Sequence, residues 1–264
     1  MAKAKATETV RVAAVSDLHY GRPNVAPLLP LIARAAAEAD VLVLAGDLTD
    51  HGNPEEARAL AKELAAFQKP MVGVLGNHDY ESGKVDDLKQ VFHECRIRIL
   101  DGDAVEIRGV GFAGVKGFCG GFGRRALGPW GETAIKEFVR EALDESLRLE
   151  TALSKLRSER KVAVLHYSPI QGTVEGEPLE IYPFLGSSRL EDPINRYPVD
   201  VVFHGHAHHG HPEGKTMSGI PVFNVSIMLL QSAYPDRPPY RLFDLPIGAP
   251  EEDMVVMESG GAAR

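Results

Sequence analysis

Five short apolar runs recur along the chain, and each is followed at once by polar residues suited to binding metal or moving a proton. They cover residues 10–15, 41–45, 71–75, 162–165 and 199–203. The runs are rich in Val and Leu and do not alternate with polar positions. This pattern predicts strands that are covered on both faces rather than strands with one face in water.

Between the runs lie three stretches with helical character. Residues 28–39 are rich in Ala and Leu, and Asn53, Pro54 and the two acids after them predict a helix that runs to about residue 67. The longest stretch runs from residue 132 to about residue 158. Its apolar stripe consists of Ile135, Phe138, Val139, Ala142, Leu143, Leu147, Leu153 and Leu156. We interpret the stripe as the face that packs on a sheet, with a dimer seam as the alternative.

Alternating strands and helices predict an α/β fold with a parallel or mixed sheet. Ligands of such sheets gather beyond the carboxyl ends of the strands, which is where all five runs place their polar residues. Four later segments are expected to be further strands, interpreted as a second sheet packed on the first. They cover residues 105–115, 220–227, 240–245 and 254–257.

Length and composition are those of an ordinary globular protein. The chain has 264 residues, of which 44% are apolar and 25% charged. No repeat or long linker divides it, so we expect one domain over residues 1–264, with flexible ends at about 1–8 and 258–264. The net charge of −8 argues against a protein that coats nucleic acid or an anionic membrane.

Cysteine content and the apolar runs bear on location. Cys95 and Cys119 are too few for a disulfide framework and are interpreted as reduced thiols. The first nine residues mix Lys with Ala, Thr and Glu and lead into no apolar signal-peptide core. Apolar runs stop at about eight residues, short of the roughly 20 needed to cross a bilayer. We therefore expect a cytoplasmic protein with no membrane partner.

The polar residues after the runs form an ordered series. Each member is weak evidence alone, because a lone His near a strand end is more often structural than a metal ligand, and Asp and Gly also favour turns. The series is Asp17-x-His19, Gly46-Asp47-x-x-Asp50, Gly76-Asn77-His78-Asp79, His166 and Gly205-His206-x-His208. In these residues the chain resembles the calcineurin-like metallophosphoesterase superfamily, whose motifs it matches in full and in order. The resemblance implies a four-layer fold, in which a sandwich of two mixed sheets is flanked by helices.

The resemblance also implies a centre with two metal ions. One ion would be held by Asp17, His19, Asp47 and His208, and the other by Asp47, Asn77, His166 and His206. Asp47 would bridge them, since two cations about 3.5 to 4 Å apart need a shared carboxylate and hydroxide. Oxygen and imidazole ligands without thiolate suit transition metals better than Mg or Ca. Manganese, or a mixed pair of iron and manganese, is the favoured interpretation, and zinc is a further option.

Attack by a metal-bridging hydroxide, with no covalent enzyme intermediate, is the implied reaction. His78 resembles the family's catalytic histidine, which protonates the departing oxygen or binds a phosphoryl oxygen. Asp50 would orient the His78 imidazole. Asp79, the next residue in the chain, is interpreted as a turn residue that stabilises the loop.

One departure from the family pattern bears on the substrate. The family's protein Ser/Thr phosphatases carry Arg where this chain has His51, and an imidazole cannot replace a bidentate guanidinium. A phosphodiester carries less charge than a monoester and needs fewer cationic partners. The departure therefore favours the small bacterial-type phosphodiesterases of the superfamily.

Several residues beside the motifs are candidates for substrate contact. They are Asn77, His51, Tyr20, Arg22 and Phe118. Phe118 and Phe122 belong to the glycine-rich stretch 117–123, interpreted either as a loop that offers a ring to an apolar leaving group or as a plain connection. Residues 175–197, which are bracketed by prolines, are a candidate cover for the site. His204 is expected to support the ligands, and His93, His209 and His211 are expected to be solvated.

The sequence thus predicts a dinuclear metal-dependent phosphodiesterase for a small soluble ester, with cyclic or linear nucleotides as leading candidates. A phosphomonoesterase or nucleotide pyrophosphatase on the same site is the first alternative. A non-catalytic, metal-dependent binding module is the second. A nuclease is disfavoured because the chain is acidic and has no basic stripe. The sequence does not indicate an oligomer.

Overall fold

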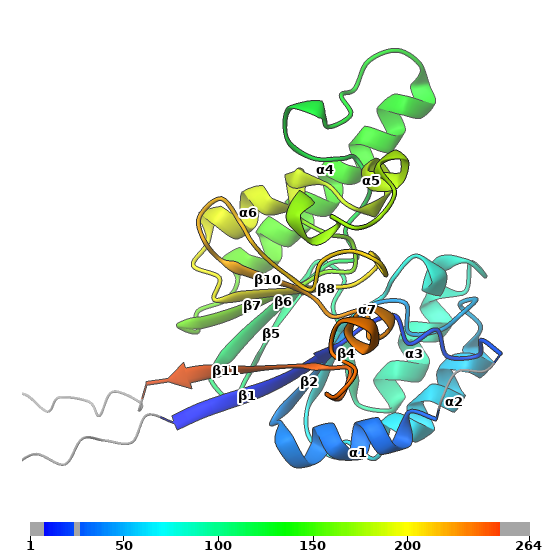
Figure 1. Ribbon diagram of the computed structural model, residues 1–264, viewed down its shortest axis with the longest axis vertical. Helices are drawn as coiled ribbons and strands as arrows, with labels where there is room; N and C mark the ends of the chain where they lie inside the picture. The colour runs from blue at the N-terminus through cyan, green and yellow to red at the C-terminus, as the bar shows by residue number, and fades with distance from the viewer. Residues whose placement is uncertain (1–7, 24–26, 249–264) are drawn as a thin grey trace, which may run out of the picture.

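A computed structural model gives the fold and describes residues 8–23 and 27–248 (Figure 1). Its eleven strands form two sheets, one with the order β11-β1-β2-β3-β4 and the other with the order β5-β6-β7-β8-β10-β9. In the first sheet β1 to β4 are parallel and β11 is antiparallel to β1. In the second sheet β6, β7, β8 and β10 are parallel, with an antiparallel strand at each edge. Both sheets are therefore mixed, as predicted.

The strands of the first sheet are β1 Glu8–Val15, β2 Val41–Ala45, β3 Met71–Val74, β4 Ile97–Ile99 and β11 Arg241–Ile247. Those of the second sheet are β5 Asp103–Ile107, β6 Val110–Gly114, β7 Arg160–Val164, β8 Val201–His204, β9 Glu213–Lys215 and β10 Pro221–Asn224. The helices are α1 Leu29–Glu38, α2 Pro54–Leu64, α3 Val85–Glu94, α4 Thr133–Ser154, α5 Tyr182–Leu185, α6 Glu191–Arg196 and α7 Ile227–Ala233.

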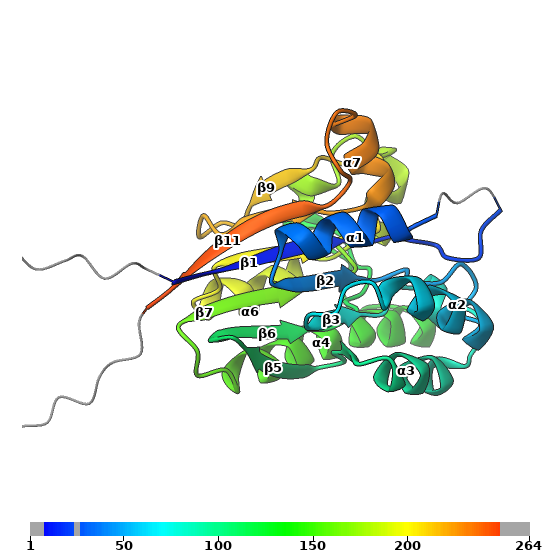
Figure 2. The same cartoon turned by 90° about the horizontal axis from the view of Figure 1, so that it is seen from below.

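The elements stack in four layers, which confirms the predicted architecture. Helices α1, α2 and α3 cover the outer face of the first sheet, and α4 and α6 cover the outer face of the second (Figure 2). The two inner faces pack on each other. Strand β1 illustrates why its run shows no alternation: Val12 and Ala14 face the second sheet, whereas Ala13 and Val15 face the helices. Both faces of the strand are buried in apolar cores.

The five apolar runs do not belong to one sheet. The first three are β1, β2 and β3 of the first sheet, whereas the last two are β7 and β8 of the second. The predicted single strand over residues 105–115 is a hairpin of β5 and β6, which turns at Arg108 and Gly109, both with positive φ. The predicted strand at 254–257 and the end at 258–264 lie outside the described residues.

The buried face of α4 differs from the predicted stripe. Leu143 and Leu147 are 40% and 57% exposed, whereas Glu145 is only 1% exposed. The buried carboxylate is tolerated because it accepts a hydrogen bond from the Gly117 backbone N–H (2.6 Å) and pairs with Arg148 (2.8 Å). The helix also ends at Ser154, before the predicted end near residue 158, and α2 ends at Leu64 rather than near residue 67.

Among the helices that the structure describes, none combines the length and the apolar character that crossing a bilayer requires.

Candidate metal centre

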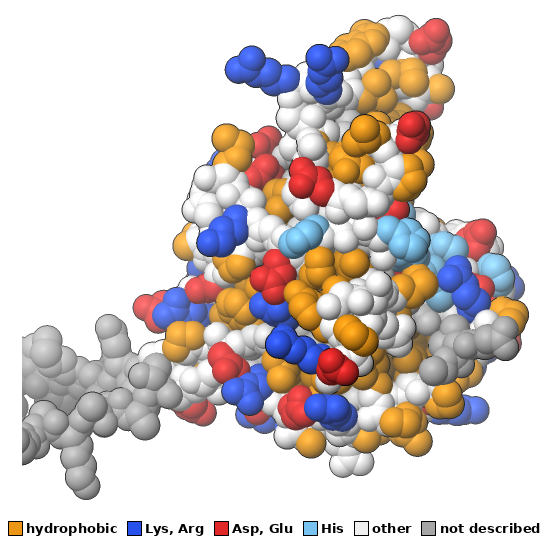
Figure 3. All heavy atoms as spheres, viewed as in Figure 1, with side chains coloured by type: hydrophobic (Ala, Val, Ile, Leu, Met, Phe, Trp, Pro, Cys, Tyr) orange, Lys and Arg blue, Asp and Glu red, His pale blue; other side chains and the backbone are white. Residues whose placement is uncertain are grey.

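The predicted ligands follow the carboxyl ends of strands from both sheets. Asp17 and His19 follow β1, Asp47 follows β2, and Asn77 follows β3. From the second sheet, His166 follows β7, and His206 and His208 follow β8. The loops are tied together across the sandwich, since the His206 backbone N–H donates to the Asp17 carboxylate (3.1 Å) and the Ser16 N–H donates to the Val225 carbonyl (2.9 Å). Figure 3 shows histidine side chains gathered on this side of the molecule, below the α5 segment.

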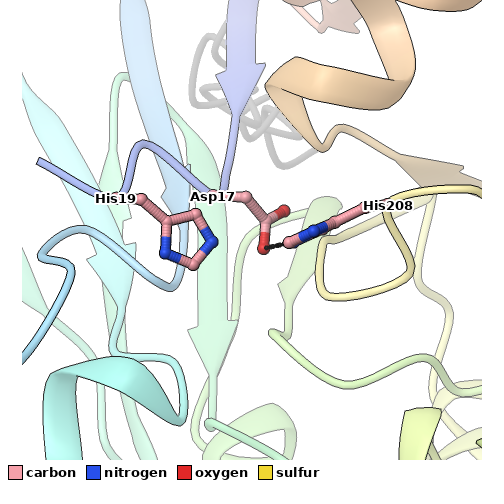
Figure 4. A group of neighbouring side chains, drawn as sticks. All are labelled: Asp17, His19 and His208. Carbon is pink, nitrogen blue, oxygen red and sulfur yellow. Dashed lines mark hydrogen bonds and ion pairs between the residues drawn. The ribbon is translucent and has the colours of Figure 1, made fainter. Parts of the chain in front are cut away.

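Six of the seven predicted ligands fall into two groups. Asp17, His19 and His208 form one group, and Asp47, His166 and His206 form the other; within each group the ligand atoms lie within 4.8 Å of one another. Figure 4 shows the Asp17 carboxylate between the rings of His19 and His208, with His208 Nε2 at 3.0 Å from Asp17 Oδ1. The groups match the division of ligands that the family resemblance implies.

Asp47 and Asn77 connect to these groups by short contacts. Asp47 Oδ1 is 3.3 Å from His166 Nε2, and Asp47 Oδ2 is 3.8 Å from His19 Nε2. Asp47 therefore borders both groups. Asn77, the seventh predicted ligand, places its side-chain oxygen 3.0 Å from His166 Nε2.

The residues present fit a pair of transition metal ions. The ring nitrogens of His19 are buried and make no hydrogen bond to any described residue, although the Asp50 and Asp47 carboxylates lie 3.3 Å from Nδ1 and 3.8 Å from Nε2. This is costly for a polar group unless it binds an ion. The donor set is oxygen and imidazole, which suits such ions. Asp17, His19, Asp47 and His206 also hold a left-handed backbone, with φ of 57°, 42°, 50° and 70°. Strain of this kind is uncommon outside Gly and clusters at functional sites, where the surrounding fold maintains it.

Two glycines let the backbone pass close to the ligands. A Cβ at Gly46, whose φ is +88°, would lie 2.4 Å from His166 Nδ1. A Cβ at Gly76 would lie 2.1 Å from Asp47 Oδ1. No side chain fits at either position, which explains the Gly before each ligand motif.

The charge states of the ligands differ across the centre. Burial would raise the pKa of Asp17, but the hydrogen bond with His208 and the charge of His166 hold it well below its ordinary value. Burial, and after it the charge of His166, lowers the pKa of His206 to about 3. Although burial would lower it, the charge and hydrogen bond of Asp47 raise the pKa of His166 to about 9. The carboxylates are thus ionised and His206 is neutral, which are the states that bind metal, whereas His166 holds a proton that must leave before its ring binds an ion.

His78 lies beside the first group. Its ring packs edge-on against His19, with centroids 4.5 Å apart, and its backbone N–H donates to Asp47 Oδ1 (2.9 Å). His78 Nδ1 lies 2.7 Å from the backbone carbonyl of Asp50, and since a carbonyl only accepts, Nδ1 carries the proton. The contact that orients the imidazole is therefore made by the Asp50 main chain. The Asp50 carboxylate instead contacts Arg22 Nε (3.1 Å) and His19 Nδ1 (3.3 Å).

A family model described as calcineurin-like phosphoesterase matches residues 10–210. The chain belongs to this family. As a calcineurin-like phosphoesterase it is a metal-dependent phosphoester hydrolase of a family with dinuclear centres. A search of curated proteins found no match.

Several solved structures share this fold. Phosphopantetheinyl hydrolase from Mycobacterium tuberculosis has a TM-score of 0.62 and 16% identity, over 88% of this chain and 95% of that one. TT1561 of Thermus thermophilus has a TM-score of 0.57 and 18% identity, over 90% and 99%. Purple acid phosphatase PPD1 from yellow lupin seeds has a TM-score of 0.52 and 13% identity, over 76% and 38%. At these identities the likeness establishes the fold.

Asp79 proves to be a structural residue, as interpreted from the sequence. It is fully buried, and its carboxylate accepts hydrogen bonds from the N–H groups of Leu48, Thr49 and Gly76 and from the Thr49 hydroxyl, at 2.6 to 3.1 Å. Burial, with the charge of Asp47 added to it, raises the pKa of Asp79 to about 6. Asp79 therefore ties the loop after β3 to the loop after β2.

Other candidates for substrate contact lie at varied distances from the ligands. The Tyr20 hydroxyl donates to Glu63 (2.8 Å), and the 61% exposed His51 side chain contacts Glu81 (3.1 Å). Phe118 packs against Phe138 in the core under α4, with centroids 5.0 Å apart. For Phe118, this packing favours the interpretation of residues 117–123 as a plain connection over a loop that offers a ring to the leaving group.

The remaining candidates from the sequence are also placed. Phe122 packs on a small apolar cluster formed by Val174, Leu185 and Ala207. His204 is fully buried, and its Nε2 lies 2.8 Å from the Thr173 hydroxyl rather than beside a ligand.

The sequence predicted residues 175–197 as a candidate cover, but it indicated neither the main-chain contact that this segment makes with a ligand nor the cavity beside the ligands. The segment at 175–197 reaches the ligands through its main chain, since the Phe184 carbonyl lies 3.1 Å from His206 Nε2. A cavity of about 570 Å³ also opens beside Asp17 and His19. A larger cavity of about 730 Å³ lies over α4 and α6, away from the ligands. Neither feature leaves a local sequence signal, because each joins segments that are distant along the chain.

Proposed function

We propose that this calcineurin-like phosphoesterase hydrolyses phosphodiester bonds of a small substrate, with cyclic nucleotides among the candidates. The observation that carries the proposal is the convergence of two ligand groups on Asp47, with His78 beside them. Asp17, His19, Asp47 and His208 would hold one ion, and Asp47, Asn77, His166 and His206 the other. Manganese, or iron with manganese, is the proposed pair.

Each part of the site has a proposed task. When bound, the two ions supply Lewis acidity and an activated water as nucleophile. The ionised carboxylates of Asp17 and Asp47 offset the charge of the cations. His78, whose Nδ1–H donates to the Asp50 carbonyl, keeps Nε2 free of that contact; in the imidazolium form Nε2 carries a second proton, which passes to the departing oxygen and leaves the ring neutral. Asp50 positions this ring through its main chain, and its carboxylate holds Arg22.

The preference for a diester rests on the cations near the site. His51 stands where an arginine would clasp a dianionic phosphate, and its imidazole is turned toward Glu81 and Asp50. Arg22 is close by, but its Nε is occupied by Asp50. The chain therefore offers little positive charge beyond the ions, and the single charge of a diester suits it better than the double charge of a monoester.

A panel of esters tests the proposal. The metal-loaded enzyme would be assayed with bis-p-nitrophenyl phosphate, p-nitrophenyl phosphate, cyclic AMP and a 2′,3′-cyclic nucleotide, across Mn, Fe, Co and Zn. We expect kcat/KM for the best diester to exceed that for the monoester by at least about tenfold, roughly 1.4 kcal/mol in transition-state stabilisation. Cleavage of the monoester alone would favour the phosphomonoesterase alternative. A lack of turnover with every ester and metal would favour the binding module.

A further inference from the structure

The cavity beside the metal centre is bounded by ligands on one side and by two helices on the others. Asp17 and His19 form its inner end, and Arg22 lies at its border. Leu31 of α1 and Met228 of α7 line opposite walls, and both side chains are half-buried. The volume of about 570 Å³ lies within the range of small-ligand sites, roughly 300 to 1,000 Å³.

Both walls are fixed to the body of the fold. Glu63 of α2 accepts hydrogen bonds from the N–H groups of Leu28 and Leu29 at 2.7 and 2.8 Å, which holds the start of α1. The start of α7 is held by the Ile227 N–H, which donates to the Ser16 carbonyl at 3.1 Å, directly before Asp17. A cavity with fixed walls binds a group without the cost of ordering its own lining.

The lining is mostly apolar. Leucine, isoleucine, methionine and proline side chains form most of it. The two arginines at its border are already paired, Arg22 with Asp50 at 3.1 Å and Arg34 with Glu38 at 3.2 Å. An uncharged group therefore suits this cavity better than a charged one, because a charge would lose its water without gaining an unpaired partner.

The position of the cavity indicates which substituent on phosphorus enters it. Its inner end is formed by ligands of the first group, and His78 is not among the described residues that line it. The departing oxygen lies beside His78 under the proposed function. The group that enters the cavity is therefore the other substituent on phosphorus.

We propose that this cavity is the subsite for the ester substituent that stays on phosphorus, and that it selects diesters whose retained substituent is bulky, uncharged and largely apolar. The inference rests on the proposed phosphodiesterase function. It names a substrate class, in which an apolar alcohol is joined through phosphate to the group that departs. A substrate with two small or charged substituents would leave the cavity unused.

The test uses a series of esters with one leaving group. Methyl, propyl and pentyl p-nitrophenyl phosphate release the same p-nitrophenolate, so only the retained substituent changes. For the metal-loaded wild-type enzyme we expect kcat/KM to rise roughly threefold per added methylene, as burial of apolar surface predicts. Met228→Glu and Leu31→Gln, on opposite walls, should each reduce the difference between the pentyl and methyl esters to within about threefold.

Met217→Glu is the matched control, because Met217 is 91% exposed and is not among the residues that line the cavity. This variant should keep the wild-type trend. Circular dichroism and metal content, measured on every variant, would identify any that fails to fold; the two walls give independent variants. Equal kcat/KM for all three esters in wild type would overturn the subsite while leaving the phosphodiesterase in place. A trend that survives in both folded wall variants would also overturn it. No hydrolysis of any ester would overturn the proposed function and the subsite with it.

Discussion

The two sheets bring different chemistry to the metal centre. The first sheet supplies both carboxylates and the amide, through Asp17, Asp47 and Asn77. The second sheet supplies imidazoles alone, through His166, His206 and His208. Among the proposed ligands, His19 is the one imidazole that follows a strand of the first sheet.

The two sheets also differ in the charge of the ligands that they supply. The pKa values of Asp17 and Asp47 are lowered, so the first sheet carries the negative charge that offsets two cations. In the second sheet burial lowers the pKa of His206 to about 3, so this proposed ligand is neutral; although burial would lower it, Asp47 raises the pKa of His166 to about 9, so His166 must lose a proton before it binds an ion. Removing charge from the first sheet should therefore affect both ions, whereas a change elsewhere should affect less.

The largest expected effect comes from Asp47→Asn, which removes one of the two carboxylates that the first sheet supplies. The substitution keeps the shape of the side chain but removes the charge that borders both ligand groups. We expect loss of both metals and a fall in kcat of about a thousandfold or more, because the ions supply the nucleophile and much of the charge stabilisation. Elemental analysis and steady-state kinetics would check this.

His78→Ala is the matched comparison for that variant. His78 lies with His19 and Asp50 in a third group of possible ligand atoms, apart from the groups of Asp17 and Asp47. Under the proposed role as proton donor, we expect both metals to stay and kcat to fall by about a hundredfold, as for loss of a general acid. Two bound ions and unchanged turnover in Asp47→Asn would refute the role of Asp47. Lost metal in His78→Ala would refute the separation between ligand and proton donor.

A smaller effect is expected from His204, at the end of β8 in the second sheet. Burial lowers the pKa of His204 to about 4. Between pH 6.5 and 4 the imidazole is therefore protonated in the unfolded chain and largely neutral in the folded chain. Stability should therefore be fully present above pH 6.5 and should fall as the pH drops, by up to about 3 kcal/mol at pH 4.

His204→Gln removes the titrating imidazole. The difference in bound protons between the unfolded and folded chains should become smaller by about one, so the stability should fall less steeply as the pH drops. Denaturant unfolding of both proteins without metal, from pH 4 to 7, measures the difference. Parallel stability curves for the two proteins would show that His204 does not titrate as described.

The last comparison concerns α4, on the outer face of the second sheet, and includes the smallest expected effect. Leu149 is fully buried, and Leu149→Ala should lower the free energy of unfolding by about 2 to 4 kcal/mol. Leu147, two residues earlier, is 57% exposed, and Leu147→Ala should change it by less than about 0.5 kcal/mol. Denaturant unfolding measures both values. A large loss of unfolding free energy in Leu147→Ala, together with a lower sedimentation coefficient, would support the alternative that the apolar stripe of α4 forms a dimer interface.

The sequence predicted much of the site because ligands follow strand ends, and that relation is local. Asp17 and His19 directly follow an apolar run, and parallel strands bring such ends to one edge. Which runs share a sheet depends on pairing between distant strands, so the split of the five runs could not be seen. The contact of His78 with the Asp50 carbonyl rather than its carboxylate depends on backbone angles that spacing does not give.

Two other differences have identifiable causes. The hairpin at Arg108 and Gly109 could have been expected, because an Arg-Gly pair within an apolar run suits a turn with positive φ. The face of α4 was misjudged because Glu145 was counted as exposed. Its burial depends on partners from Gly117 and Arg148, and the first of these lies in a loop far away along the chain.

The pairing of β11 with β1 has a consequence for how the enzyme is made. The register joins Glu8 to Ile247, so the strand that leads into Asp17 and His19 gains one of its two neighbours from the last strand that the structure describes. On the ribosome one edge of β1 stays open until that strand has emerged, and pairings between such distant segments form slowly. Metal loading is therefore expected to follow synthesis of β11, and a nascent chain cut before residue 241 should fail to retain metal ions.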